Sequence, residues 1–236
     1  MSVRRRRLLL VAASVPVVVV AVLGVEVELA RRGDRLAAAD LSFPAEGPRT
    51  AVWLGDSTAA GVGVTDGDDA VASVVGRSLG QRVEMLAVSG ATLAEVVDEQ
   101  LPAVAALRPD VVYVSVGAND VTHLTKVGDF ERRYGELLDA LPAGVPVQVL
   151  GVPDMGAPPR LLQPLRAIAG WRGRRLDGVV RRAAAEHDGA TYVDIAGPTG
   201  PPFRRDPDRY FADDGYHPSA AGYRLWADAV LATTAG

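Results

Sequence analysis

Three residues of this chain have the types and the spacing that acyl transfer requires. Ser57, within Gly55-Asp56-Ser57-Thr58, is a candidate nucleophile, and far downstream Asp214 and His217 stand three residues apart. Serine is a poor nucleophile at neutral pH unless a base lies within hydrogen-bond reach, and that base needs a third group to fix its tautomer. We therefore expect Ser57, His217 and Asp214 to act as nucleophile, base and orienting acid.

Apolar runs place these residues at the edge of a predicted parallel sheet. Residues 51–54, 83–88 and 111–116 indicate buried strands, and a polar element follows each one directly. The carboxyl ends of parallel strands meet at one edge of a sheet, where ligands collect. We predict that three donors at this edge hold the oxygen that becomes negative during acyl transfer. They are the amides of Ser57 and Gly90 and the side chain of Asn119.

The remaining pattern alternates strands with helices, which predicts an α/β protein, a three-layer α/β/α sandwich with a mostly parallel five-stranded sheet. Thr92 and Glu95 have the spacing of a capping box, and Pro102 is expected to interrupt the helix that they open. Residues 197–213, rich in Pro and Gly, predict a long loop. The other predicted elements are strands at 145–152 and 191–194 and helices at 71–79, 92–107, 130–141, 165–187 and 219–231.

With its motifs in this order, the sequence from about residue 50 to residue 235 resembles the SGNH, or GDSL-type, hydrolases, a family of serine esterases and lipases. The resemblance matches Ser57 to the nucleophile, Gly90 and Asn119 to the glycine and asparagine of the second and third blocks, and Asp214 with His217 to the final Asp-x-x-His. It implies a flavodoxin-like sheet and a triad of Ser57, His217 and Asp214.

Some positions depart from the family pattern or have a second interpretation. Thr58 replaces the leucine that usually follows Gly-Asp-Ser, which leaves the catalytic atoms in place and changes the pocket beside the serine. Asp213 lies one residue outside the matched spacing, so Asp214 is preferred. Ser57 and Asn119 also suit helix caps, and Gly90 suits a turn. His123 is either a substrate contact or a surface residue.

The N-terminal residues predict an anchor or an export signal. Arg4 to Arg7 precede an uncharged, largely apolar stretch at 8–25, which spans about 27 Å if it is helical. The positive cluster should stay cytoplasmic and place the rest of the chain outside. We expect residues 1–32 to form a membrane anchor or a cleaved signal, 33–49 a linker, and 50–236 the hydrolase domain. Absence of cysteine excludes disulfides.

Charge and composition exclude several other classes of protein. Residues 1–35 hold seven Arg and three acidic residues, so the totals of 25 basic and 29 acidic side chains fall to 18 and 26 beyond them, a formal charge of −8. That charge disfavours a nucleic-acid partner. The three histidines, at 123, 187 and 217, lack metal-ligand spacing. No metal or cofactor is expected.

The sequence therefore predicts an exported or membrane-anchored serine esterase that cleaves a small-molecule or lipid ester through an acyl-enzyme. Two alternatives stay open: a cell-envelope carbohydrate O-acetylesterase or acyltransferase with the same triad, and a catalytically silent binding domain. The sequence predicts no oligomeric state. Several apolar residues near the expected mouth of the site form either an acyl-accepting surface or a packed loop. They are Val62, Val64, Met155, Pro158, Leu161 and Leu162.

Overall fold

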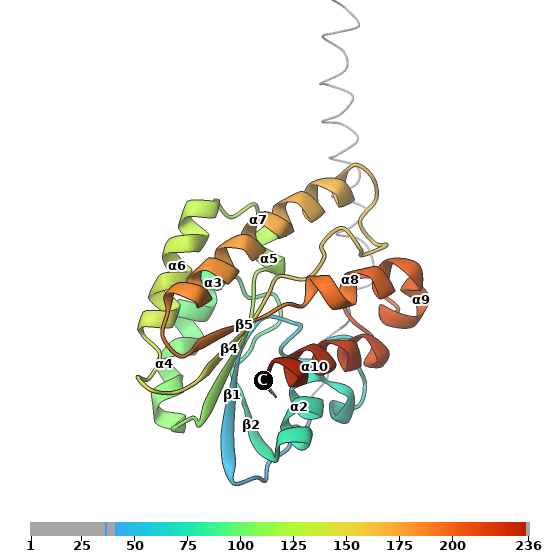
Figure 1. Cartoon of the computed structure of the whole chain (residues 1–236). Helices are drawn as coiled ribbons and strands as arrows, with labels where there is room; N and C mark the ends of the chain where they lie inside the picture. Colours follow the sequence, from blue (N-terminus) through green and yellow to red (C-terminus); the bar gives the residue numbers. More distant parts are fainter. Residues whose placement is uncertain (1–35, 37–40, 235–236) are drawn as a thin grey trace, which may run out of the picture.

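Five parallel strands form one sheet with helices on both of its faces (Figure 1). The computed structural model describes residue 36 and residues 41–234, so the predicted N-terminal hydrophobic helix lies outside the described residues. The order β2-β1-β3-β4-β5 puts β1 at the point where the chain reverses the direction in which it adds strands. The predicted three-layer fold is confirmed. The strands are β1 (Arg49–Gly55), β2 (Gln81–Met85), β3 (Val111–Ser115), β4 (Val147–Leu150) and β5 (Ala190–Val193).

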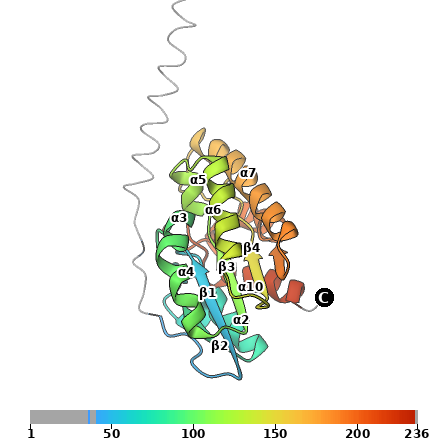
Figure 2. The same cartoon turned by 90° about the vertical axis from the view of Figure 1, so that its left-hand side faces the viewer.

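Alternate side chains of the strands supply two hydrophobic cores, one on each face of the sheet. On β1, Val52 and Leu54 face one layer of helices, whereas Ala51 and Trp53 face the other. Figures 1 and 2 show the two layers on opposite sides of the sheet. The first layer holds α3 (Leu93–Glu95), η2 (Val96–Gln100), α4 (Leu101–Val104), η3 (Ala105–Leu107), α5 (Ala118–Thr122), α6 (Val127–Asp139) and α7 (Leu165–Glu186), and the second holds α2 (Val71–Leu79), α8 (Ala196–Arg205) and α10 (Ala220–Thr234).

The helix predicted at 92–107 forms with a change of helical type in its middle. Its capping box is confirmed, because the Glu95 carboxylate accepts the Thr92 amide at 2.7 Å and the Thr92 side chain accepts the Glu95 amide. Residues 96–100 (η2) then form a π turn, in which the Leu101 amide donates to the Val96 carbonyl. Pro102 has no N–H and cannot donate to a carbonyl four residues earlier, as an α-helix requires. The α-helical pattern of α3 therefore changes to a π turn just before Pro102.

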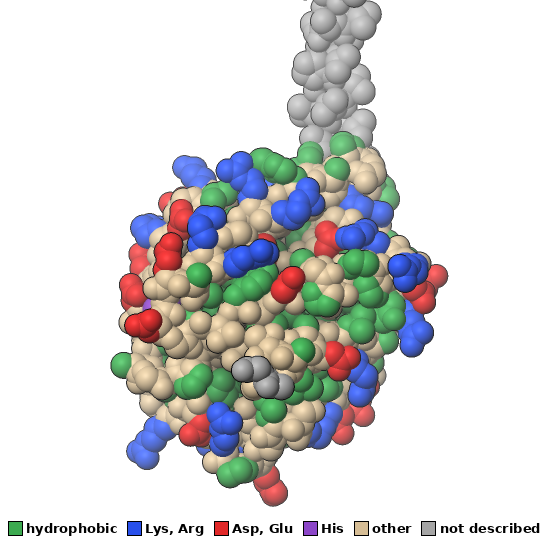
Figure 3. Space-filling view, in the orientation of Figure 1, with side chains coloured by type: hydrophobic (Ala, Val, Ile, Leu, Met, Phe, Trp, Pro, Cys, Tyr) green, Lys and Arg blue, Asp and Glu red, His purple; other side chains and the backbone are tan. Residues whose placement is uncertain are grey.

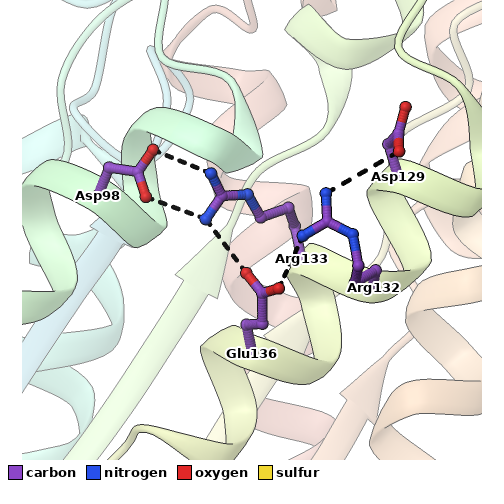
Figure 4. Close-up of polar contacts among 5 residues, drawn as sticks. All are labelled: Asp98, Asp129, Arg132, Arg133 and Glu136. Atoms are coloured by element: carbon purple, nitrogen blue, oxygen red, sulfur yellow. Dashed lines mark hydrogen bonds and ion pairs between the residues drawn. The ribbon is translucent and has the colours of Figure 1, made fainter.

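Arg133 of α6 joins η2 to the neighbouring helix (Figure 4). Its two terminal nitrogens bond the two carboxylate oxygens of Asp98 at 3.0 and 3.1 Å, and it also pairs with Glu136 at 3.1 Å. Arg132 reaches the same Glu136 at 2.7 Å. A bidentate pair within a network holds its geometry better than an isolated surface pair. The network therefore fixes η2, and with it Gln100, against α6.

The long loop predicted at 197–213 is wrong, because this region is largely helical. It forms α8 and a short helix, α9 (Pro207–Tyr210). Pro198 lies in the first turn of α8, where the N–H groups have no acceptor within the helix, and the Asp194 carboxylate accepts the Gly197 amide at 2.8 Å. Burial of Phe203 against Tyr210 and Phe211 offsets the cost of the two prolines inside the helix.

Residues 41–44, in the segment predicted as a linker, lie against the second core. Leu41 and Phe43 pack on that core, and the Pro44 carbonyl accepts the Val83 amide at 2.7 Å. Within the part of the chain that the structure describes, no helix is long and apolar enough to cross a bilayer.

Candidate active site

The candidate nucleophile lies in a tight turn at the carboxyl end of β1. Gly55 adopts φ 141°, and a Cβ on it would overlap the Ser115 carbonyl of the adjacent strand, so this close approach requires glycine. The Asp56 amide donates to that same carbonyl at 3.0 Å. The turn thereby leaves the sheet with Ser57 at its tip, and the Ser57 side chain is nearly buried.

Gln100 clamps this turn from the π segment, a contact that the sequence analysis missed. Its Oε1 accepts the Gly55 amide and its Nε2 donates to the Gly55 carbonyl, both at 2.9 Å. Gln100 is itself buried, with 4% of its surface exposed. Because both polar groups of Gly55 are satisfied by one side chain, the clamp sets where β1 ends and the serine turn begins.

The turn at 213–218 brings the histidine to the serine. His217 Nε2 lies 2.9 Å from Ser57 Oγ, and His217 Nδ1 lies 2.6 Å from Asp214 Oδ2. Asp214 Oδ1 accepts the amides of Tyr216 and His217, both at 2.9 Å, which locks the carboxylate within its own turn. Asp213 is exposed. The structure therefore brings Ser57, His217 and Asp214 together in one chain of hydrogen bonds.

The donors around Asp214 decide its charge. Burial raises the pKa of the Asp214 carboxyl, but the His217 ring and the amides of His217 and Tyr216 outweigh burial and hold that pKa below its ordinary value. A charged carboxylate can only accept, so Nδ1 of His217 carries the proton and Nε2 presents its lone pair to the Ser57 hydroxyl. This tautomer is the one that a general base at Nε2 requires.

The pKa of Asp56, next to the serine, is shifted in the opposite direction. Burial raises the pKa of its carboxyl to about 6, against the smaller lowering effects of the Thr58 amide and hydroxyl and of His217. Both Thr58 groups donate to Asp56 Oδ1, at 2.9 and 2.8 Å, and the Thr58 hydroxyl also lies 3.0 Å from Ser115 Oγ. The threonine that replaces the usual leucine thus supplies a donor to a buried carboxyl group.

The three predicted oxyanion donors lie on adjoining loops at this edge. The loop after β2 is joined to Gly55 by the Val88 amide at 3.1 Å, and Gly90 turns it with φ 89°. Asn119 Nδ2 donates one hydrogen to the Ala91 carbonyl at 3.0 Å and keeps its second hydrogen. Within the described residues the amides of Ser57 and Gly90 donate to no acceptor. The Ser57 amide is unpaired in a buried turn, which is rare, and the Gly90 amide is unpaired on an exposed loop, so both are available to a ligand.

A largely apolar cavity of about 40 Å³ opens beside Ser57 and His217. Of the apolar residues singled out in the sequence, Met155 and Pro158 line it. Val62, Val64 and Leu161 are buried elsewhere in the fold, and Leu162 is exposed. The opposite wall was not foreseen, because it comes from the region predicted as a loop. It consists of Thr199, Gly200, Phe203 and Phe211.

Asp120 and His123 form hydrogen bonds to residues outside the triad. Asp120 ties its loop together, because its carboxylate accepts the Leu93 amide and the Thr125 hydroxyl, both at 2.9 Å. His123 is exposed, and its Nδ1 lies 2.8 Å from the Asn119 carbonyl. His187 ends α7, with Nδ1 buried and without a hydrogen-bond partner in the described part of the chain. Among those same residues no cluster of three potential metal ligands occurs.

A serine at a strand end, a histidine bonded to it and a buried aspartate on the other ring nitrogen, all on a 2-1-3-4-5 parallel sheet, define an α/β/α serine hydrolase. Residues 53–225 match the model of the GDSL-like Lipase/Acylhydrolase family. The chain belongs to this family of serine ester hydrolases.

Individual relatives are consistent with that family. The chain is 35% identical over 188 residues to the GDSL-like esterase Rv1075c of Mycobacterium tuberculosis, an alignment that covers 75% of this chain and 59% of that protein. Among solved structures, a lipase/acylhydrolase from Enterococcus faecalis aligns with TM-score 0.63 at 21% identity, covering 78% of this chain and 94% of its own. Axe2, an acetylxylan esterase from Geobacillus stearothermophilus, aligns with TM-score 0.55 at 19% identity over 81% and 96%. At these identities the two structures support the fold alone.

Proposed function

We propose that this protein is an esterase that cleaves carboxylic esters through an acyl-enzyme on Ser57. The observation that carries the proposal is the unbroken series of hydrogen bonds from Asp214 through His217 to Ser57. His217 Nε2 takes the hydroxyl proton as Ser57 Oγ attacks the ester carbonyl, and it then returns that proton to the departing alcohol. Water, deprotonated by His217, attacks the acyl-serine, releases the acid and restores the hydroxyl.

The charge that develops on the carbonyl oxygen needs donors already in place. The amides of Ser57 and Gly90 have no acceptor among the described residues, and the Asn119 carboxamide has one hydrogen to spare. These three groups are our candidates for the oxyanion hole. Loss of one such donor costs about 10²- to 10³-fold in kcat.

The size of the cavity favours a short acyl group. Its 40 Å³ is roughly a quarter of the volume of about 150 Å³ that accepts the six carbons of benzene in an engineered protein core, which leaves room for about two non-hydrogen atoms beyond the ester carbonyl. This observation also supports the second candidate function, removal of acetyl groups from a carbohydrate.

We further propose that the protein works at the outer side of a membrane. The support comes from the sequence: four arginines followed by the apolar run at 8–25, which suits an uncleaved anchor with the hydrolase domain outside. Flotation of the full chain with vesicles after an alkaline carbonate wash tests the anchor. Release of the intact chain by that wash would contradict it.

A panel of p-nitrophenyl esters from acetyl to palmitoyl, assayed with the full chain in a mild detergent, tests both the activity and the acyl length. We expect kcat/KM to be highest for acetyl and propionyl esters, and Ser57→Ala to lower kcat by about 10⁴-fold or more. A preference for octanoyl or longer esters would contradict the short-acyl proposal. Absence of turnover on every ester, with the fold intact, would favour a silent binding domain.

A pair of methionine variants sharpens the assignment of the cavity. Met155→Ala removes side-chain volume from the cavity wall, so we expect the preferred acyl chain to lengthen. Met85→Ala makes the same change on β2, away from the cavity, and should leave the preference where it is. Equal shifts in the two variants would show that this cavity does not determine the preferred acyl chain length.

A further inference from the structure

Four of the five large hydrophobic side chains that remain exposed among the described residues lie in two neighbouring segments, 121–128 and 155–176. Each lies in a segment that follows the carboxyl end of a strand, the same edge that carries Ser57. Scattered exposed hydrophobics are normal, but a shared location indicates an interaction surface. Within residues 41–234 the five are Val88, Leu124, Leu162, Ile168 and Trp171.

Two of these side chains are the most telling. Trp171 is 50% exposed on the outer side of α7, and Leu124 is 65% exposed after α5. Leu124 also adopts φ 59°, a left-handed conformation that glycine or asparagine reaches at lower cost. A leucine at this position therefore presents an apolar side chain to solvent in spite of an unfavourable backbone.

Positive charge surrounds these side chains in a chain that is acidic overall. Segments 121–128 and 155–176 together hold one Lys, five Arg and no Asp or Glu, whereas the whole chain has a net charge of −4. Figure 3 shows Lys and Arg side chains over α7 at the end of the molecule where α7 begins. Lys126 and Arg174 form no ion pair within the described residues.

Two of the arginines join the segments without losing their charge. Arg172 donates to the carbonyl oxygens of Val121 at 3.1 Å and of Thr125 at 2.8 Å, which ties the two segments side by side. Arg166 donates to the carbonyl oxygens of Leu161 and Pro159. Carbonyl oxygens satisfy the guanidinium groups but do not cancel their charge. Arg172 therefore holds the two segments, with their cations and their exposed apolar side chains, next to each other.

This surface begins where the active-site cavity ends. Met155 and Pro158 line the cavity, and four residues after Pro158 the same loop is exposed at Leu162. The loop is also bonded to the histidine turn, because the Arg160 amide donates to the Gly215 carbonyl at 3.1 Å. Whatever covers the surface consequently lies next to the opening beside Ser57.

We propose that this basic-apolar face docks the protein onto a bilayer that contains anionic lipids. We define the face as Leu124, Leu162, Ile168 and Trp171 together with Lys126, Arg166, Arg172 and Arg174. Cations attract anionic headgroups, and tryptophan and aliphatic side chains insert at the boundary between headgroups and acyl chains. Docking would hold the cavity beside Ser57 at the lipid surface. The inference rests on the proposed membrane location but not on the chemistry of Ser57.

Other partners account for only part of the face. A nucleic acid would match the cations but leave four hydrophobic side chains without a role. A two-fold pairing with a second copy would cover the hydrophobic side chains but oppose two surfaces of the same positive charge. Anionic lipid answers both features at once.

Tryptophan fluorescence tests the proposal in the full chain. Trp53 and Trp226 are buried, with 0% and 2% exposed, and Trp171 is the third tryptophan of the sequence. The chain is reconstituted into vesicles of phosphatidylcholine with or without phosphatidylglycerol, each carrying doxyl-labelled lipid as a quencher. We expect lipid quenching in the anionic vesicles, weak quenching in the neutral ones, and loss of the quenched component in Trp171→Phe.

A charge variant with a matched control completes the test. Removing two cations in Lys126→Gln with Arg174→Gln should weaken docking roughly 30-fold. Arg181→Gln with Arg182→Gln removes the same charge from the far half of α7 and should change docking little.

Equal quenching in wild type and Trp171→Phe would overturn the proposal. So would protection of Trp171 from aqueous acrylamide without lipid quenching, because protein would then cover the face. Flotation measures the anchor and ester hydrolysis measures the chemistry. A failure of either is therefore distinguishable from a failure of docking, which lipid quenching measures.

Discussion

The turn after β1 and the turn before α10 each place a buried aspartate near the catalytic serine, but they shift the pKa values of the two carboxyl groups in opposite directions. Asp214 accepts two amides and the His217 ring and has a lowered pKa. Asp56 has only the amide and hydroxyl of Thr58 as donors, and burial raises its pKa to about 6. The number of donors, and not burial alone, decides which aspartate serves as a charged partner for the histidine.

The two turns also differ in how they are fixed. Asp214 is bonded to atoms two and three residues along its own turn, so the local sequence sets its position. Gly55 and Asp56 depend on Gln100 and Ser115, which come from other elements. The histidine turn is therefore built from short-range contacts, and the serine turn from long-range ones.

The largest expected effect is on catalysis by Asp214→Asn. An amide cannot hold Nδ1 of His217 protonated in the same way, so we expect kcat to fall by about 10⁴-fold while the fold persists. Asp213→Asn changes the neighbouring exposed aspartate and should leave kcat near the wild-type value. Steady-state kinetics on an acetyl ester measures both. A large loss in Asp213→Asn with a small one in Asp214→Asn would reverse the assignment.

The next largest effect is on the free energy of unfolding, whose pH dependence distinguishes Asp56 from Asp214. The raised pKa of about 6 means that the folded state keeps a proton which the unfolded state releases near pH 3.8. Stability then falls as pH rises from about 4 to about 6, by about 3 kcal/mol. We expect Asp56→Asn to remove this fall and to exceed the wild type in stability at pH 7, with kcat/KM within about tenfold.

Urea unfolding at pH 4 and pH 7 measures the effect. Wild type and Asp56→Asn should be alike at pH 4 and differ at pH 7. The control is Asp213→Asn, which should not change the pH dependence. An Asp56→Asn variant that is less stable than the wild type at pH 7 would show that the donors around Asp56 stabilise its carboxylate and that burial does not raise its pKa.

Gln100→Leu tests the long-range support of the serine turn. It leaves the amide of Gly55 without a partner in a buried position and its carbonyl with only the Val88 amide, so we expect a loss of about 2 kcal/mol in the free energy of unfolding. Gln148→Leu is the matched control, because Gln148 is a buried glutamine whose Oε1 has no partner among the described residues. That variant should be neutral or stabilising. Equal losses of unfolding free energy in the two variants would show that the contacts of Gln100 with Gly55 do not stabilise the serine turn.

The smallest expected effect concerns Thr58. Thr58→Val removes the hydroxyl that donates to Asp56 and keeps the amide, so the pKa of Asp56 should rise further and stability at pH 7 should fall by about 1 kcal/mol. In the Asp56→Asn background the pH-dependent part of that loss should disappear. A double-mutant cycle at pH 7 measures the coupling free energy between Thr58 and Asp56. Additive effects would show that the two residues do not interact.

The contrast between the turns also explains what the sequence alone predicts. The strands and the Asp-x-x-His turn follow from local patterns, namely apolar runs and a three-residue spacing, and the structure contains both. The Gln100 clamp joins residues 45 apart and has no local signal. α8 was missed because Pro and Gly favour loops, whereas burial of Phe203, a tertiary effect, makes this stretch helical.

The cavity illustrates the same limit. Met155 and Pro158 follow a strand at the active edge and were identifiable from the sequence, but Thr199 and Phe203 reach the serine only because α8 folds against α10. Position relative to a strand end predicts which residues are near the site. The wall that α8 contributes to the cavity depends on packing between elements that are distant in the sequence.

Labelling with a fluorophosphonate, read by intact mass and peptide mapping, tests the central claim most directly, because only an activated serine displaces the fluoride. We expect a single adduct on Ser57 in the wild type and in Asp56→Asn, a strongly slowed reaction in Asp214→Asn, and none in Ser57→Ala. An adduct that persists in Ser57→Ala, or a folded wild type that takes up no label, would contradict the account.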